Sequence, residues 1–148
     1  SKYLHFSDKT KIGEFQGTKK LYKIVPIIDH LNDKFKSSYG LSQNISIDES
    51  LTLWKGRLSF RQYIPLKASQ FGIKSFELCE STSGYTWSFV IYTGKGTDFT
   101  SEGLPNNCPT STAIVLKLLQ PILDEGHTVW LDNWYNSPEL SKILKERK

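Results

Sequence analysis

The sequence predicts a mixed α/β fold in which an antiparallel group of strands precedes a strand–helix–strand crossover. Three observations support this class. The stretches 46–57 and 85–92 contain alternating apolar and polar side chains, as half-buried strands do. Residues 111–123 instead place their apolar side chains at helical spacing. A further strand is expected over residues 127–131, directly after that helix, and this order completes the crossover.

Length and composition are those of one globular domain with a real core. The chain has 148 residues, of which 38% are hydrophobic and 13% aromatic. Its net charge of +4 permits a polyanionic partner without requiring one. Cys79 and Cys108 lack zinc-site spacing and are too few for a disulfide scaffold, so we expect free thiols in a reducing compartment. No apolar run approaches the roughly 20 residues of a membrane helix.

The amino-terminal quarter is predicted to be helical. Residues 1–17 are interpreted as a loop or a short helix. From Lys19 to Lys36 apolar residues recur at helical spacing, with Thr18 available as the N-cap. Pro26 lies inside this run and should kink or split the helix, because proline removes a backbone hydrogen bond. The lysines fall largely on the other face, where a solvated surface is favoured over a DNA-contacting helix.

An acidic pair interrupts the strand expected over residues 46–57. A carboxylate such as Asp48 is costly to bury in a strand unless a cation pairs with it. Lys55 and Arg57 follow at once, so one interpretation is a salt bridge at the strand end. Ligation of a metal cation is the other, and this stretch alone favours the salt bridge. Glu49 is predicted to point to the opposite face of the strand and is left out of the site.

Further strands are expected in the middle of the chain. Residues 59–67 form one candidate, and residues 75–80 form another. The turn 81–84 and the aromatic-rich strand 85–92 complete an antiparallel hairpin with the latter. The aromatic row of this hairpin is interpreted as core rather than as a stacking platform. Residues 94–96 are interpreted as a turn, because Gly-Lys-Gly alone does not make a phosphate-binding loop.

Basic and aromatic residues alternate along the first of these strands and beyond it. The basic members are Arg57, Arg61, Lys67 and Lys74, with Tyr63 and Phe71 between them. Such interleaving suits a nucleic-acid surface, where cations meet phosphates and rings stack on bases. Alternating strands also produce this pattern without any binding role, so the spacing alone leaves both interpretations open.

The carboxy-terminal third is predicted to contain two helices. The first is capped by Thr110 or Ser111, bends at Pro121 and stops near Gly126. The second starts at residues 137–139, because Ser-Pro-Glu supplies a cap, a first-turn proline and a first-turn acid. These signals are local, so we expect the second helix to begin at that point whatever the fold around it.

The crossover predicts a meeting of two aspartates. It places the strand 127–131 parallel to an earlier strand of the same sheet. If that earlier strand carries Asp48, then Asp132 lies beside it. Two neighbouring aspartates form a hard-oxygen site suited to Mg²⁺ or Mn²⁺. His127 also lies near this strand, but we interpret it as a lone surface histidine rather than a ligand.

Several short motifs occur in an order and spacing that are specific together, although each is ordinary alone. They are Ile47-Asp48-Glu49-Ser50, Lys55-Gly56-Arg57, Gln62-Tyr63-Ile64-Pro65-Leu66-Lys67, Gly72-Ile73-Lys74, Ser83-Gly84-Tyr85, Ile91-Tyr92-Thr93-Gly94-Lys95 and Leu131-Asp132-Asn133-Trp134-Tyr135-Asn136-Ser137. In this order they resemble the transposase domain of the piggyBac family. The resemblance covers residues 45–148, and residues 3–40 look like the helical segment that precedes that domain.

The resemblance implies a ribonuclease-H-like mixed sheet flanked by helices, with three catalytic aspartates. Asp48 matches the first aspartate and Asp132 the second. In the family they hold two divalent metals, Mg²⁺ or Mn²⁺, that serve DNA strand cleavage and strand transfer. The third aspartate and a cysteine-rich zinc-binding end lie further downstream in the family than this chain reaches. The chain is therefore expected to be a fragment truncated before the end of the fold, and to be inactive alone.

The resemblance also sets expectations for organisation and partners. Residues 1–40 would form the preceding helical segment, and residues 41–148 the first part of the DDE transposase domain. The partners implied are transposon ends, TTAA target DNA and a second copy of the protein, in the nucleus and without a membrane. The DNA-backbone candidates are Lys55, Arg57, Lys67 and Lys74. The alternatives are a domesticated DNA-binding protein without cleavage and an interaction domain that keeps only the fold.

Overall fold

The computed structural model describes residues 6–65, 70–101, 104 and 107–147. Within them the chain forms five strands and three α-helices, and the predicted mixed α/β class is confirmed. The helices are α1 (Val25–Ser38), α2 (Thr110–Leu119) and α3 (Pro138–Glu146), and short 3₁₀ turns cover Lys9–Gly13, Lys19–Leu21 and Gln120–Ile122. The strands are β1 (Asn44–Leu53), β2 (Gln62–Tyr63), β3 (Phe71–Glu80), β4 (Thr86–Ile91) and β5 (Thr128–Leu131).

Strand β1 is central to the sheet. On one side β3 pairs with it in antiparallel register, from Ile45 opposite Glu80 to Leu53 opposite Gly72. On the other side β5 pairs with it in parallel, as the crossover predicted. β2 and β4 both pair with β3, along different parts of that strand, and the β3–β4 hairpin is the one expected from the sequence. The parallel pairing decides where the aspartates of β1 and β5 meet.

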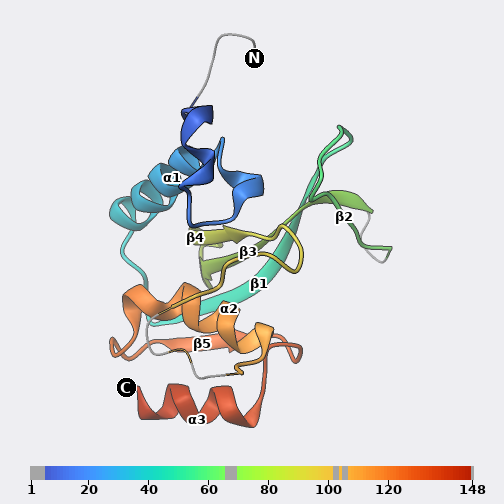
Figure 1. Cartoon of the computed structure of the whole chain (residues 1–148). Coiled ribbons are helices and arrows are strands. Elements are labelled where there is room, and N and C mark those ends of the chain that lie inside the picture. The colour runs from blue at the N-terminus through green and yellow to red at the C-terminus, as the bar shows by residue number, and fades with distance from the viewer. Residues whose placement is uncertain (1–5, 66–69, 102–103, 105–106, 148) are drawn as a thin grey trace.

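The core lies between the sheet and the carboxy-terminal helices, with α2 and α3 arranged along the β5 end of the sheet (Figure 1). Ile45 and Ile47 of β1 and Leu78 of β3 are almost fully buried. α2 buries most of its residues against them, because its apolar side chains occur on nearly all sides of the helix.

The amino-terminal helix begins later than the sequence pattern predicted. A 3₁₀ turn occupies Lys19–Leu21, and α1 starts at Val25 with Pro26 in its first turn. Proline splits the predicted helix rather than kinking it, because its fixed φ and missing N–H suit a first turn. The hydroxyl of Thr18 does not cap the turn and instead accepts a hydrogen bond from the backbone N–H of Asp98, at 3.3 Å.

α1 packs against the outer edge of β4. The Asn32 side chain accepts a hydrogen bond from the Phe89 backbone N–H at 2.8 Å and donates one to the Phe89 carbonyl at 3.1 Å. This amide thus satisfies backbone groups that an edge strand would leave unpaired. The division of the chain near residue 40 stays a prediction.

Three predictions about the ends of α2 and α3 can be compared with the structure. α2 begins at Thr110 with Pro109 at the N-cap, so the predicted side-chain cap from Thr110 or Ser111 is wrong. Pro121 lies in the 3₁₀ turn that follows α2, where it ends the regular helix. α3 starts as predicted, with the Ser137 hydroxyl accepting from the Leu140 N–H at 3.1 Å.

The strand predicted over 59–67 shortens to Gln62–Tyr63 among the described residues, and β3 starts already at Phe71. Together with the end of β1 these segments extend beyond the sheet as an arm, defined here as residues 53–65 and 70–72 (Figure 1).

Both cysteines are free thiols, as predicted. None of the helices in the described part of the chain combines the length and apolar character needed to span a membrane.

Candidate functional site

Asp48 and Asp132 lie side by side at the end of the parallel ladder. The last paired residues of β1 and β5 are Ile47 and Leu131, and each aspartate is the next residue in its strand direction. Neighbouring strands are about 4.8 Å apart, so the two carboxylates start from adjacent backbone positions. Both aspartates are exposed, although Ile47 directly before Asp48 is buried. The structure therefore brings together the pair that the crossover predicted.

Backbone amides orient both carboxylates. Asp48 Oδ1 accepts a hydrogen bond from the N–H of Glu49 at 2.7 Å, and Asp132 Oδ1 accepts one from the N–H of Asn133 at 2.5 Å. The ion pairs in the described part of the chain lie elsewhere and join Arg147 to Asp124 and His127 to Glu125. The strand-end salt bridge to Lys55 or Arg57 is thus not formed among these residues.

Tyr135 lies beneath the aspartate pair. Its backbone N–H donates to the carbonyl of Asp132 at 3.0 Å, which closes a turn, and its side chain is 0% exposed. Burial raises the pKa of the Tyr135 hydroxyl, and the charges of Glu49, Asp48 and Asp132 raise it further. Three carboxylates therefore gather near this one hydroxyl.

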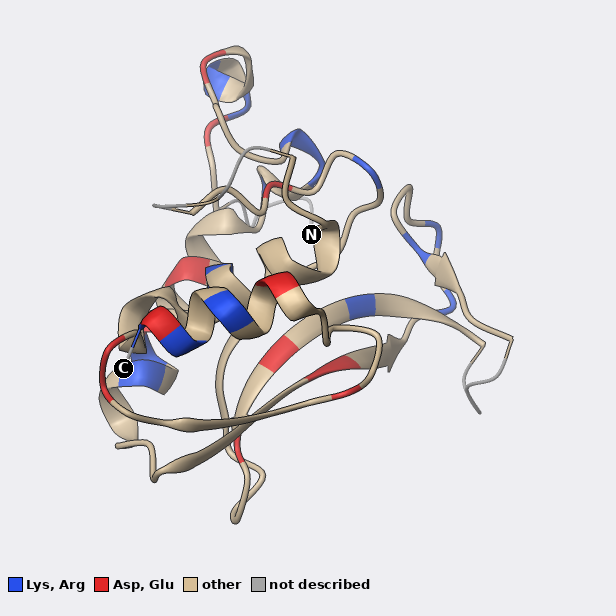
Figure 2. Ribbon diagram, turned by 90° about the horizontal axis from the view of Figure 1, so that it is seen from below, with Lys and Arg blue, Asp and Glu red and all other residues tan. Residues whose placement is uncertain are grey.

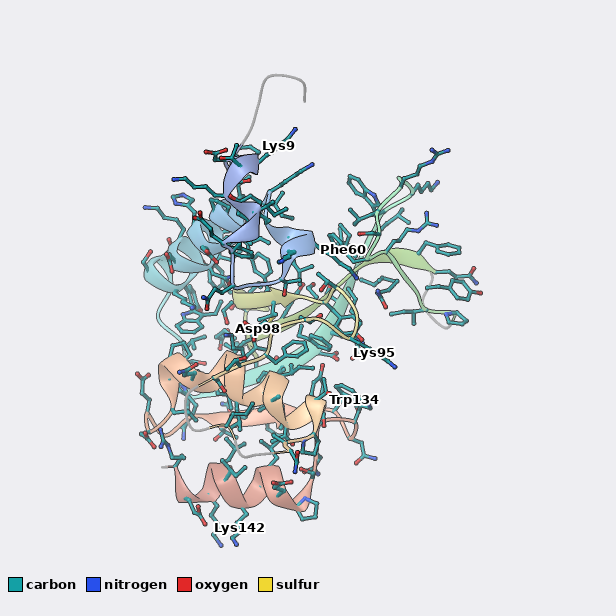
Figure 3. All side chains as sticks on the ribbon, viewed as in Figure 1. Lys9, Phe60, Lys95, Asp98, Trp134 and Lys142 are labelled. Atoms are coloured by element: carbon teal, nitrogen blue, oxygen red, sulfur yellow. The ribbon has the colours of Figure 1, made fainter. Side chains whose placement is uncertain are left out.

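Aromatic rings and a lysine border the site. The rings of Phe76 and Trp134 are parallel, with centroids 6.3 Å apart, and Tyr135 meets both rings edge-on. Lys74 Nζ lies 4.9 Å from the Phe76 centroid and 5.8 Å from that of Trp134. Trp134 remains 53% exposed and projects on the side from which the arm extends (Figure 3). Lys74, predicted as a DNA contact, thus lies beside the acidic site.

The arm carries the other basic candidates. Lys55 and Arg57 are exposed in the loop after β1, and Lys67 lies outside the described residues. The Arg61 guanidinium lies 4.7 Å from the centroid of the Phe71 ring, which in turn packs on Tyr63. The sequence from 50 to 76 contains no Asp or Glu. The described part of the arm accordingly shows basic residues and no acidic ones (Figure 2).

His127 lies at the opposite end of β5 from Asp132. Its side chain is 13% exposed, Nδ1 is 3.0 Å from the carbonyl oxygen of Ser42, and Nε2 is 3.5 Å from the Glu125 carboxylate. It is therefore a partly buried structural residue rather than the surface histidine predicted. Among the described residues, no group of three or more His, Cys, Asp or Glu side chains is placed to hold a metal ion.

Sequence reasoning missed Tyr135 and Trp134 as parts of the site. Both follow Asp132 in a turn, where neither strand nor helix period sets the direction of a side chain. Glu49, whose charge acts on Tyr135, was also left out of the site, because alternation places it on the other face from Asp48. The Tyr135 ring lies near the Glu49 face because it packs on Phe76, the residue opposite Glu49 in the ladder.

Comparison with known proteins gives two findings. The family model described as "Transposase IS4" matches residues 1–148. The solved structure titled "Cryo-EM structure of piggyBac transposase synaptic complex with hairpin DNA" matches with a TM-score of 0.81 and 28% sequence identity. That match covers 96% of this chain and 28% of the other chain, so this chain spans less than a third of that transposase. The resemblance drawn from the motifs and the ribonuclease-H-like mixed sheet are confirmed.

Proposed function

Because this chain belongs to the transposase family, as a piggyBac-type transposase domain, we propose that it supplies two carboxylates of a site for DNA strand cleavage and strand transfer. One observation carries the proposal. Asp48 and Asp132 come from segments far apart in the sequence, yet both follow directly on the last pair of the β1–β5 ladder. Two exposed carboxylates at neighbouring positions repel each other, and a divalent cation bound between them would offset that repulsion.

The donor chemistry of this pair fits Mg²⁺ or Mn²⁺. Both cations prefer carboxylate oxygen, and Asp48 and Asp132 would be the ligands from this chain. Each keeps free lone pairs, because a single backbone N–H occupies one oxygen. When bound, such ions activate an attacking oxygen of water or of a DNA 3′-hydroxyl and stabilise the leaving oxygen. The amides of Glu49 and Asn133 hold the two carboxylates in place for this role.

DNA would approach from the side of the arm. Lys55 and Arg57 supply exposed cations in a stretch without acidic residues, and Lys67 belongs to the same stretch of sequence. Lys74 lies nearer the acidic site and would meet a phosphate close to the reacting bond. The proposed substrates are transposon ends and TTAA target DNA. The proposed assembly is a homodimer, and the proposed location is the nucleus.

Two alternative functions are compatible with the same fold. A domesticated DNA-binding protein would keep the basic arm and lose cleavage, and an interaction domain would keep only the fold. The aspartate pair favours the first proposal over both, since neither alternative requires adjacent carboxylates.

Manganese titration followed by NMR tests the proposal. Mn²⁺ should broaden amide signals around Asp48 and Asp132 selectively, and either Asp48→Asn or Asp132→Asn should abolish this broadening. Asp124→Asn is the control, because that exposed carboxylate pairs with Arg147 away from the site and should leave the broadening intact. Broadening scattered over surface carboxylates, unchanged in the two site variants, would contradict the proposed metal site.

A further inference from the structure

The β1–β5 ladder ends just before the two aspartates. Ile47 and Leu131 are the last paired residues, so backbone hydrogen bonds of the ladder do not set the spacing between Asp48 and Asp132. A metal site needs its ligands held closely in place, and groups outside the ligand set usually supply that support. Some other contact must therefore tie the turn after β5 to strand β1.

Tyr135 is the buried side chain of that turn. Its ring is enclosed by Phe76 and Trp134, and its hydroxyl oxygen is buried without a hydrogen-bond partner among the described residues. An unpaired buried hydroxyl is costly, because it has lost its hydrogen bonds to water. A hydrogen-bond acceptor close to the Tyr135 hydroxyl would remove this cost.

Glu49 provides that acceptor. It lies directly opposite Phe76 in the antiparallel ladder, so both side chains stand on the same face of the sheet. Tyr135 packs edge-on against the same Phe76 ring, with centroids 6.4 Å apart. Glu49 is half-buried, and its charge contributes more than that of Asp48 or Asp132 to the raised pKa of Tyr135, after burial itself.

We infer that the Tyr135 hydroxyl is a positioning group that donates a hydrogen bond to the Glu49 carboxylate. The bond fastens the turn of Asp132 to the strand of Asp48, on the face of β1 opposite to Asp48 itself. Glu49 thereby contributes to the site without being a ligand. The consequence for metal binding rests on the proposed function, whereas the link between turn and strand does not.

Amide hydrogen exchange tests the link in the metal-free chain. Exchange at Asn133 and Tyr135, whose N–H groups bond to Asp132, should be about tenfold faster in Tyr135→Phe and in Glu49→Leu. Glu49→Gln keeps an acceptor oxygen and should exchange like the unaltered chain. The double variant Tyr135→Phe with Glu49→Leu should exchange no faster than either single variant, since both remove one bond.

A matched control separates positioning from general loosening. Tyr85→Phe also removes a hydroxyl that has a hydrogen bond, here to the carbonyl of Phe35 at 3.0 Å, but far along the hairpin from the acidic site. It should leave exchange at Asn133 unchanged. Three results would overturn the inference. They are equal acceleration of exchange in Tyr85→Phe, unaltered exchange in Tyr135→Phe, and exchange in Glu49→Gln that is as fast as in Glu49→Leu.

Manganese affinity extends the test to the site. Tyr135→Phe and Glu49→Leu should each weaken Mn²⁺ binding by about tenfold, as removal of a supporting group typically does. Tyr85→Phe should bind Mn²⁺ like the unaltered chain, and a loss of affinity in that variant would count against the inference. If the unaltered chain shows no Mn²⁺ site at Asp48 and Asp132, the proposed metal site fails, and the exchange data alone decide on the Tyr135–Glu49 link.

Discussion

Asp48 of β1 and Asp132, the residue that follows β5, each lie one residue beyond the Ile47–Leu131 pair. Like charges at neighbouring positions of a sheet destabilise it. We therefore expect Asp48→Asn, which keeps an acceptor oxygen for the Glu49 N–H, to stabilise the metal-free chain by about 0.2–1 kcal/mol, measured by urea unfolding. The gain should shrink in 1 M salt, where the screening length falls to about 3 Å. A loss of stability, or a gain that salt does not alter, would show that the two carboxylates do not repel each other.

The buried carboxylate of Glu80, at the β3–β4 turn, is expected to make the stability of the chain depend on pH. This carboxylate accepts hydrogen bonds from the hydroxyls of Ser42 and Ser83 and the amides of Thr82 and Ser83. These bonds, that of Ser42 first, lower the pKa of Glu80 from 4.5 to about 2. Because the folded-state pKa is the lower one, the stabilisation is complete above pH 4.5 and is lost as pH falls towards 2.

Glu80→Gln should accordingly destabilise the chain at pH 7, and the difference from the unaltered chain should narrow as the pH falls through this range. Urea unfolding at several pH values measures it. Glu14→Gln is the control, since Glu14 is exposed outside the sheet and should change little at any pH. An equal loss from Glu80→Gln at pH 7 and pH 2 would contradict the linkage.

Gly72 allows β1 and β3 to approach closely where the arm begins. A Cβ added there would lie 2.4 Å from the carbonyl oxygen of Thr52 and 2.9 Å from Leu51 Cγ. Since the backbone oxygen of β1 cannot move aside freely, we expect Gly72→Ala to cost about 1–3 kcal/mol, as overpacking does. Thermal unfolding measures the loss, and Gly40→Ala, where nothing lies within 4 Å of the added atom, should cost much less. Similar effects of both changes would mean that β1 and β3 do not pack closely at this point.

The charges of the arm predict the salt dependence of DNA binding. If Lys55 and Arg57 contact phosphates, each change to Ala should lower the slope of log K against log salt by about one. Fluorescence anisotropy with a labelled duplex measures the slope. Lys142→Ala is the matched control, because Lys142 projects from α3 on the far side from the arm (Figure 3). An equal reduction by Lys142→Ala would indicate diffuse attraction rather than an arm contact.

The sequence predicted the site only in part. Strong local signals gave the β3–β4 hairpin, the start of α3 at Ser137 and the strand that leads into Asp132. Proline positions were harder, because Pro26 inside an apolar run fits either a kinked helix or the first turn of a new one. The residues that decide between such alternatives are neighbours in space rather than in sequence.

Local sequence patterns and tertiary packing each account for part of the structure of this protein. The sequence by itself determined the class of fold, the order of its elements and the aspartates Asp48 and Asp132, because periodicity, turn chemistry and motif order are local properties. Only the tertiary structure decided that Tyr135 packs edge-on against Phe76 and Trp134 and that Lys74 lies over those two rings. Those contacts depend on how a turn packs against a sheet. Residues that pack together in this way are not separated by any regular interval in the sequence, so a sequence pattern does not reveal them.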